Sequence, residues 1–248
     1  MWASDGLSVA RHGNVWHAKL DRPAKLNALD AGVVEALIQT VNEAETQKIS
    51  ALVLSGGGKN FSAGFDLAEI ENQTDAELLW RFVRIELLLQ SLAHASFATV
   101  ALAHGRNFGA GVDVFAACRY RVAAPGTTFR LPGLQFGLVL GTGRLISILG
   151  ADRARYILED SRIFDARQAY EWGFIHQEVT PENWDTVISE RVSAARALPD
   201  DARQKLYALS SYSDADRDLA ELVRSAAKPG IKTRLTEYKA RSAKSAAK

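Results

Sequence analysis

The sequence predicts an α/β fold, in which strands and helices alternate along residues 1–180 and helices alone follow. Two short apolar runs, 51–54 and 99–103, are typical of strands buried on both faces of a sheet. The segments before and between these runs carry apolar residues at helical spacing. Such alternation is typical of a sheet covered by helices. After about residue 181 the spacing is helical throughout, which predicts a helical region added to the α/β core.

Residues 7–47 predict a hairpin followed by a helix. Residues 15–20 alternate in polarity and place Trp16, Ala18 and Leu20 on one face, and His12-Gly13-Asn14 supplies the turn before this strand. Asp30 is a typical N-cap residue and predicts a helix that runs through about Gln47.

Each buried strand is followed by a glycine-rich segment. The first strand runs into Ser55-Gly56-Gly57-Gly58, and the second precedes a stretch from Gly105 to Gly111. A helix over 75–95 lies between the two strands, because Thr74 and Glu77 have the spacing of a capping box. Another helix is expected from near Gly109 to about residue 118.

The C-terminal part predicts helices and a basic tail. Pro181 opens one helix, segments 200–212 and 214–227 predict two more, and Pro199 and Pro229-Gly230 punctuate them. We divide the chain into a core, 1–190, and a helical region, 191–248. The tail from residue 232 onward is expected to be solvated, because it carries Lys232, Arg234, Lys239, Arg241, Lys244 and Lys248 against Glu237.

Composition argues against several classes of protein. The 248 residues are 47% hydrophobic and 24% charged, as in soluble globular proteins, and the net charge of +1 lacks the basic excess of a nucleic-acid-binding protein. Cys118 is the single cysteine, which excludes an internal disulfide and a CxxC zinc site and favours a reducing compartment. No apolar run reaches the roughly 18–20 residues of a membrane span. We expect a soluble cytoplasmic protein, without a signal peptide, that contacts neither nucleic acid nor membrane.

Nucleotide and metal motifs do not match. Val53 and Asn60 stand where a P-loop needs glycine and a hydroxyl residue, and Val114 and Ile146 stand where the dinucleotide fingerprint needs its third glycine. The five histidines are scattered, with no HExxH or HxH pair, so no metal site is predicted.

Two segments that follow the buried strands are candidates for a functional site, 60–67 and 105–113. Both are rich in small residues, and a helix begins in the second. Free amides at a helix start attract negative charge, so two such loops could aim two N–H groups at one oxygen, as in an oxyanion hole. The other interpretation is that the glycines simply form turns; the residues alone leave both open.

Four segments resemble, in order, motifs of the crotonase superfamily, the enoyl-CoA hydratase/isomerase family. Residues 22–29 resemble its R-P-x-x-x-N-A-L segment, and 61–67 its F-S-A-G-x-D-L loop. Residues 104–113 resemble its N-G-x-x-x-G-G-G-x-E stretch, and 169–175 its A-x-x-W-G-L-V segment. The resemblance implies a crotonase-like spiral of ββα repeats, with a C-terminal helical trimerisation region that forms a homotrimer or a dimer of trimers.

The resemblance also implies roles for particular residues. The amides of Phe65 and Ala110 would form the oxyanion hole for the thioester carbonyl of an acyl-CoA. The residues expected to contact coenzyme A are Lys25, Ala63, Asp66, Leu67 and Lys239, the last supplied by a neighbouring subunit. No cofactor is expected beyond the coenzyme A that is part of the substrate.

The catalytic carboxylates depart from the family pattern. Hydratases of the family use two glutamates, and this sequence has Asp113 at the first position and Gly133 at the second. Asp113 keeps the carboxylate on a shorter arm, whereas Gly133 has no side chain. Thr142 stands near the position where dehalogenase-like members place a nucleophilic aspartate.

Glu86 lies on or beside the apolar stripe of helix 75–95 and has two interpretations. It is either an edge residue that pairs with Arg81, Arg84 or solvent, or a second acid/base group that faces Asp113. A carboxylate on an apolar face is unfavourable unless it is paired or protonated.

Two functions therefore remain open. The first is an acyl-CoA-processing enzyme of the hydratase/isomerase type, which the preserved loops and Asp113 favour. The second is a non-catalytic acyl-CoA-binding homologue or assembly subunit, which Gly133 favours.

Overall fold

The computed structural model describes residues 2–4, 6–211 and 214–246, so Lys248 of the predicted tail lies outside the described residues. The strands are β1 (Trp2–Ser4), β2 (Leu7–His12), β3 (Val15–Leu20), β4 (Ala51–Gly56), β5 (Ala98–Ala103), β6 (Arg106–Phe108), β7 (Tyr120–Ala123), β8 (Thr128–Arg130), β9 (Phe164–Asp165) and β10 (Gln177–Glu178). The α-helices are α1 (Ala31–Thr46), α2 (Asp75–Ala93), α3 (Ala110–Ala117), α4 (Thr142–Leu149), α5 (Ala151–Glu159), α6 (Ala166–Glu171), α7 (Trp184–Arg196), α8 (Asp200–Ser210), α9 (Ala215–Ala226) and α10 (Ile231–Ala246). Short 3-10 helices are η1 (Pro23–Lys25), η2 (Ile70–Asn72), η3 (Gly133–Phe136) and η4 (Pro181–Asn183).

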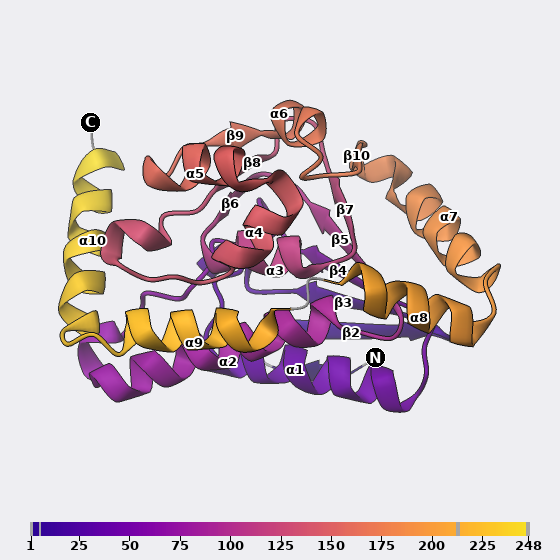
Figure 1. Cartoon of the computed structure of the whole chain (residues 1–248), viewed down its shortest axis with the longest axis horizontal. Coiled ribbons are helices and arrows are strands. Elements are labelled where there is room, and N and C mark those ends of the chain that lie inside the picture. Colours follow the sequence, from indigo (N-terminus) through magenta and orange to yellow (C-terminus); the bar gives the residue numbers. More distant parts are fainter. Residues whose placement is uncertain (1, 5, 212–213, 247–248) are drawn as a thin grey trace.

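The main sheet has the strand order β1-β2-β3-β4-β5-β7-β10 (Figure 1). The predicted hairpin is confirmed: β2 and β3 pair antiparallel, with Trp16, Ala18 and Leu20 buried. From β3 onward each strand pairs parallel with the next, which requires crossovers between strands. A second, three-stranded sheet has the order β6-β8-β9, so the chain winds from one sheet to the other between β5 and β7.

Local sequence signals place the helices where they were expected. The Asp30 side chain accepts a hydrogen bond from the Val33 amide at 2.8 Å and caps α1. Thr74 and Glu77 form the predicted reciprocal capping box at the start of α2.

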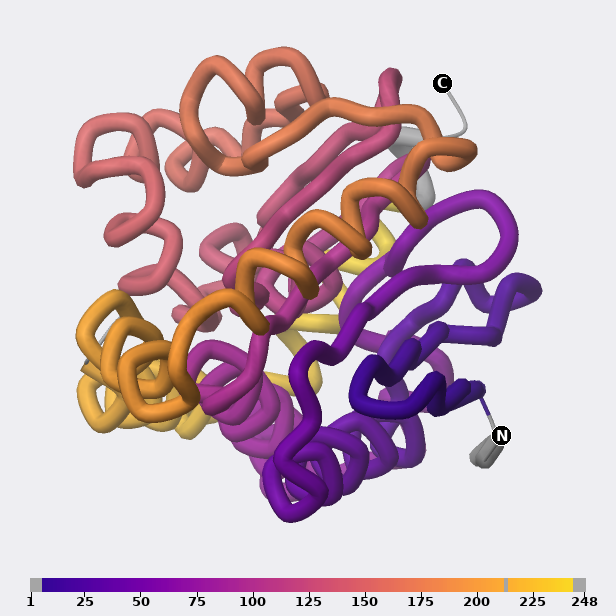
Figure 2. Tube along the Cα trace, turned by 90° about the vertical axis from the view of Figure 1, so that its right-hand side faces the viewer, coloured from indigo at the N-terminus to yellow at the C-terminus, as the bar shows by residue number. Residues whose placement is uncertain are grey.

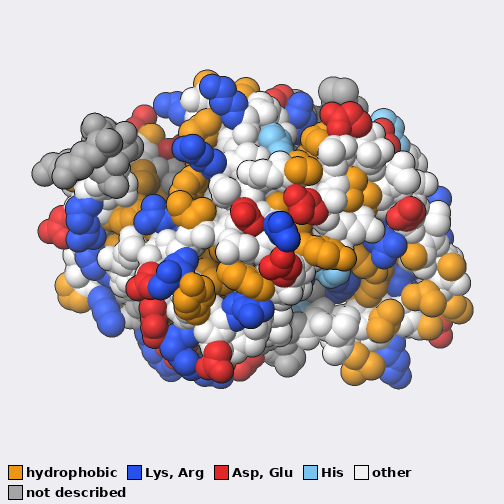
Figure 3. All heavy atoms as spheres, turned by 90° about the horizontal axis from the view of Figure 1, so that it is seen from above, with side chains coloured by type: hydrophobic (Ala, Val, Ile, Leu, Met, Phe, Trp, Pro, Cys, Tyr) orange, Lys and Arg blue, Asp and Glu red, His pale blue; other side chains and the backbone are white. Residues whose placement is uncertain are grey.

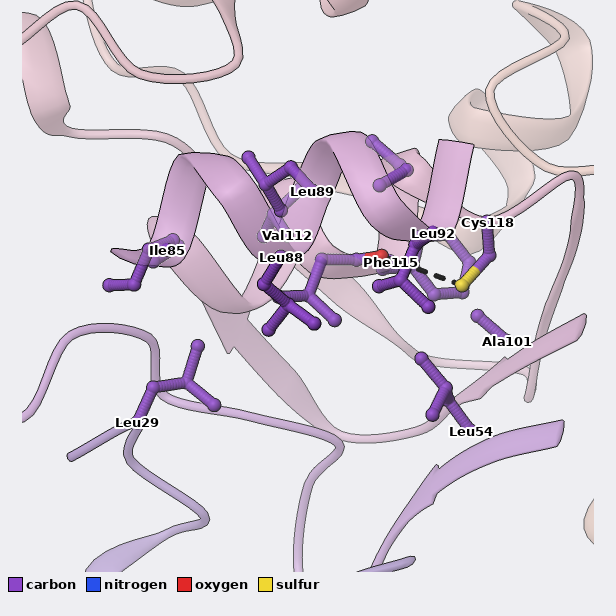
Figure 4. Close-up of a cluster of buried hydrophobic side chains, with 14 of the residues drawn as sticks. Leu29, Leu54, Ile85, Leu88, Leu89, Leu92, Ala101, Val112, Phe115 and Cys118 are labelled. Atoms are coloured by element: carbon purple, nitrogen blue, oxygen red, sulfur yellow. Dashed lines mark hydrogen bonds between the residues drawn. The ribbon is translucent and has the colours of Figure 1, made fainter. Parts of the chain in front are cut away.

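Helices cover both faces of the main sheet. On one face α2 and α3 pack together, and Figure 4 shows Leu88, Leu89 and Leu92 of α2 gathered with Phe115 of α3. Cys118 lies in this core and donates to the Val114 carbonyl. On the other face α7, seen crossing the sheet in Figure 2, packs Val187, Ile188 and Val192 against the apolar runs of β4 and β5.

The predicted solvated tail is wrong. Residues 231–246 form α10, which stands at one end of the molecule in Figure 1 and packs against α2, η2 and η3. Ile231 and Leu235 are buried, which the excess of lysine and arginine in this segment concealed. Of its basic residues, Arg234 donates to the Phe136 carbonyl at 2.9 Å, whereas Lys239 and Arg241 are exposed.

The surface is mixed in charge. Figure 3 shows acidic, basic and apolar side chains interspersed over one face, in line with the net charge of +1. Within the part of the chain that the structure describes, no helix combines the length and apolarity that crossing a membrane requires.

Candidate active site

A cavity of about 890 Å³ opens between the loop that follows β4, the start of α3, the 130–142 segment and α10. Its walls are mainly apolar, and they include Phe65, Phe82, Phe108, Leu131 and Leu138. Among the described residues, Asp113 is the one that brings a carboxyl group to the wall of this cavity. An apolar pocket with a few convergent polar groups is the usual form of a small-molecule site.

Two backbone amides meet at the cavity wall. Phe65 and Ala110 both line it, and in the described part of the chain neither amide donates a hydrogen bond. The segments are in close contact: a Cβ atom added at Gly64 would lie 2.3 Å from the Phe108 carbonyl oxygen and 3.1 Å from the Ala110 nitrogen. The amide of Ala110 is at the first position of α3, where the helix supplies no acceptor.

Hydrogen bonds fix both segments. The Gly64 carbonyl accepts from the Leu29 amide at 2.7 Å, and the Gly109 amide donates to the Arg130 carbonyl at 2.8 Å. The Asn107 side-chain oxygen accepts from the amides of Phe61 and Ser62, each at 3.1 Å, and so ties the two segments together. The site is therefore preorganised by backbone hydrogen bonds and by the buried side chain of Asn107, which belongs to the second of the two segments.

The Phe65 side chain is held by its neighbours. Its ring stacks on that of Phe82 at a centroid distance of 4.3 Å, and the Arg81 guanidinium lies over the ring at 4.0 Å. Arg81 also donates to the Asp66 carbonyl at 3.0 Å. These contacts fix the position of the Phe65 backbone, since the ring and the following carbonyl are both constrained.

Asp113 is buried in the first turn of α3, at 5% exposure, and packs against the backbone of Gly141. The φ angle of Gly141 is +62°, and a Cβ atom there would lie 2.3 Å from a carboxyl oxygen of Asp113. Burial raises the pKa of Asp113 well above its usual range, and the carboxylate of Glu86 raises the pKa further, against the effect of Arg144.

Glu86 is buried behind this wall rather than at an edge. Its exposure is 0%, and it accepts from the Arg144 guanidinium at 3.3 Å and from the Gln90 amide at 3.2 Å. The edge interpretation is wrong, because Arg81 binds the loop at Asp66 and Arg84 pairs with Glu35 on α1. Glu86 does not line the cavity, so it is not placed to contact a ligand there.

The five predicted coenzyme A contacts do not all reach the cavity. Ala63 and Leu67 line it, whereas Lys25 is exposed at the end of η1. The Asp66 carboxylate instead accepts from Arg22 at 3.0 Å and from the Ala68 amide at 2.9 Å, which holds the loop. Lys239 comes to this loop from α10 of the same chain, and its Nζ lies 3.2 Å from the Leu67 carbonyl oxygen and 3.3 Å from a Glu71 carboxylate oxygen.

Gly133 and Thr142 both line the cavity, from the segments that carry the departures from the family motifs. A Cβ atom at Gly133 would lie 3.1 Å from the Leu138 carbonyl oxygen, so the backbone is tightly folded at this point.

Sequence reasoning missed Arg144 and the contribution of α10. Arg144 is 4% exposed on α4, and α10 supplies Leu235, Tyr238 and Arg241 to the cavity wall. Leu235 and Tyr238 are three residues apart, which is helical spacing, but the surrounding lysines and arginines masked this signal.

Known proteins resemble this chain over most of its length. A solved candidate enoyl-CoA hydratase/isomerase from Bordetella parapertussis is 48% identical, with a TM-score of 0.92, over 94% of this chain and 98% of that one. The fatty acid oxidation complex subunit alpha of Aliivibrio fischeri is 33% identical over 219 residues, 84% of this chain but 30% of that protein. The 4-chlorobenzoyl coenzyme A dehalogenase-2 of an Arthrobacter species is 28% identical over 78% of this chain and 73% of that one.

The fold and the order of the motifs agree with these similarities. The similar proteins are named for several different reactions. The sequence profile of the enoyl-CoA hydratase/isomerase family matches residues 10–244, which is nearly all of the chain. The chain therefore belongs to the enoyl-CoA hydratase/isomerase family and has the crotonase fold.

Proposed function

We propose that this protein is an enzyme that binds an acyl-CoA thioester and stabilises its enolate, with a hydration, dehydration or double-bond isomerisation reaction. The observation that carries the proposal is the position of two amides, those of Phe65 and Ala110, at a cavity that Asp113 also lines; neither amide donates to any of the described residues. Two fixed N–H donors stabilise the negative charge that develops on a thioester oxygen, and removing one such donor typically costs about 10²–10³ in rate.

Asp113 is the proton-transferring group in this proposal. It lines the same cavity as Ala110 and lies three positions later on α3, so both face the same part of a bound thioester. Gly133 supplies no side chain, and Glu86 does not line the cavity. One carboxyl group would therefore act as both the proton donor and the proton acceptor of the reaction.

Coenzyme A would bind along the loop at 63–67. Ala63 and Leu67 provide small and apolar wall, and the exposed ammonium groups of Lys25 and Lys239 provide positive charge for phosphates. Because Lys239 reaches the loop from its own chain, this contribution requires no neighbouring subunit. Asp66 would act indirectly, by holding the loop through Arg22.

Assembly into a trimer or a dimer of trimers is also proposed. Leu206 and Leu209 lie three residues apart on α8 and are 51% and 80% exposed, which supports burial against another subunit. Light scattering should give a trimer or hexamer, and a stable monomer at working concentration would contradict this proposal.

The second candidate function is acyl-CoA binding without catalysis, which Gly133 favours. Calorimetry with coenzyme A and a panel of thioesters, followed by turnover assays of the same panel, separates the two functions. Asp113→Asn should retain coenzyme A binding and lose activity by about 10²–10⁴-fold, the usual contribution of general acid–base catalysis. Binding without turnover of any thioester would favour the second function, and the absence of binding would refute both.

A further inference from the structure

A cluster of charged side chains is buried between the helices that flank the cavity. Glu86 of α2, Asp113 of α3 and Arg144 of α4 are 0%, 5% and 4% exposed. Asp218 of α9 is also buried, and its charge raises the pKa of Glu86. Burial and the charge of Arg144 lower the pKa of His94, the C-cap residue of α2. Glu86 and Asp113 thus both lie within electrostatic reach of the Arg144 guanidinium, and Asp218 lies within reach of Glu86.

The hydrogen bonds divide this cluster unequally. Arg144 donates to Glu86 at 3.3 Å, and Gln90 donates to the same Glu86 oxygen at 3.2 Å. Asp113 accepts none of the hydrogen bonds in the described part of the chain and lies against the Gly141 backbone instead. The remaining nitrogens of Arg144, Nε and Nη1, are buried without a protein partner in the structure as described.

Charge balance decides which carboxyl keeps a proton. A buried carboxylate is unfavourable unless a cation or donors compensate it. The Arg144 guanidinium compensates one carboxylate, and it is in hydrogen-bond contact with Glu86 rather than with Asp113. Burial raises the pKa of both carboxyl groups, and it raises the pKa of Asp113 most, to well above the usual range.

We propose that Glu86 and Arg144 are positioning residues. Glu86 pairs with the Arg144 guanidinium, which would otherwise stabilise the carboxylate form of Asp113. The ion pair therefore keeps Asp113 as a neutral acid in the resting enzyme. This inference rests on the proposed function for its catalytic meaning and on the buried cluster for its physical basis. It assigns Glu86 a role through Asp113, without contact with the substrate.

The proton balance of hydration then closes on a single carboxyl group. Water adds through its oxygen to the β-carbon of an enoyl thioester, and the electron pair of the carbon–carbon double bond moves toward the thioester oxygen to give the enolate. The O–H bond of Asp113 breaks as its proton forms a C–H bond at the α-carbon. The proton released by the attacking water returns to the Asp113 carboxylate, so the enzyme ends as it began.

Carbon-13 NMR of protein labelled at the aspartate carboxyl carbons tests this inference without any substrate. The Asp113 signal is assigned by its loss in Asp113→Asn. The wild-type protein should show Asp113 protonated at neutral pH. Glu86→Gln leaves Arg144 uncompensated, so the Asp113 titration midpoint should fall by about 1–3 pH units, the usual effect of an adjacent cation.

Glu35→Gln is the matched control, because it makes the same change in the half-buried ion pair between Glu35 and Arg84, away from Asp113. It should leave the Asp113 midpoint unchanged. If a thioester is turned over, the limb of the pH–rate profile that reports Asp113 should shift in Glu86→Gln by the same amount as the NMR midpoint. A merely structural role of Glu86 would not shift this limb.

An ionised Asp113 in the wild-type protein at neutral pH overturns the inference, whether or not Glu86→Gln folds. An Asp113 midpoint in Glu86→Gln equal to that of the control also overturns it. If no thioester is turned over while the NMR midpoints shift as expected, the proposed function fails and the inferred charge arrangement stands.

Discussion

Gly64→Ala should separate the two amides on which the proposed oxyanion hole depends. The φ angle of Gly64 is +83°, and a Cβ atom there would lie 2.3 Å from the Phe108 carbonyl oxygen. Ordinary contact of a Cβ begins at 3.4 Å, so one of the two backbone segments must move by about 1 Å. The Ala110 nitrogen, 3.1 Å from the same Cβ position, lies on one of these two segments, so either movement changes the separation of the two amides.

The size of the effect follows from these contacts. An alanine in the left-handed region costs about 1–2 kcal/mol of folding stability. The overpacking against Phe108 adds about 1–3 kcal/mol. A displacement of about 1 Å in a catalytic group can lower the rate by about 10²-fold. We therefore expect Gly64→Ala to lose about 2–5 kcal/mol of stability and about 10²-fold in kcat.

Gly126→Ala provides the matched control. Its φ angle is +76°, and nothing lies within 4 Å of its Cβ position, so it has the backbone cost without the clash. Urea unfolding and turnover of the best thioester should be compared in the two variants. If the two variants are equally stable and Gly64→Ala has an unchanged kcat, the close contact between the loops does not position the amides, and the proposed basis of the site is refuted.

Three further predictions concern ionisable groups and the thiol. The pKa of Asp113 is raised in the folded state, so its contribution to stability is full below the unfolded pKa near 3.8 and is lost as pH rises through the folded pKa. Asp113→Asn should therefore flatten the decline of the unfolding temperature toward alkaline pH. An unaltered decline would contradict the burial of Asp113 as a neutral acid. Lys239→Gln should weaken coenzyme A binding in calorimetry and leave the binding of a thioester without the nucleotide phosphates unchanged, whereas an equal loss for both ligands would point to a structural role. Burial raises the pKa of Cys118 to about 12, so a thiol reagent should label native protein far more slowly than urea-unfolded protein at mildly alkaline pH, and equal rates would show that Cys118 is accessible.

The elements that could be predicted from the sequence are those specified by residues close together in the chain. The cap at Asp30 and the box formed by Thr74 and Glu77 each involve hydrogen bonds between residues three positions apart. The buried strands β4 and β5 were visible because both faces of each are covered, which leaves a continuous apolar run. The candidate amides of Phe65 and Ala110 were found because they belong to local motifs that recur in the family.

The missed features depend on pairings that no local pattern encodes. The helix α10 was misjudged because its few buried residues are spread among lysines and arginines, and only packing against α2, η2 and η3 shows which side is covered. Lys239 reaches Leu67 across 172 positions of the chain.

Local patterns in the chain were enough to predict the order of the elements, the two loops that carry the candidate amides, and Asp113 as the carboxyl residue at one of the family's catalytic positions. Packing alone shows that Glu86 is buried, that its partner is Arg144, 58 positions later, and that Asp113 forms no ion pair with any of the described residues. A helix cap is formed by residues within one turn of chain, whereas the burial and pairing of a charge depend on which distant helices pack around it.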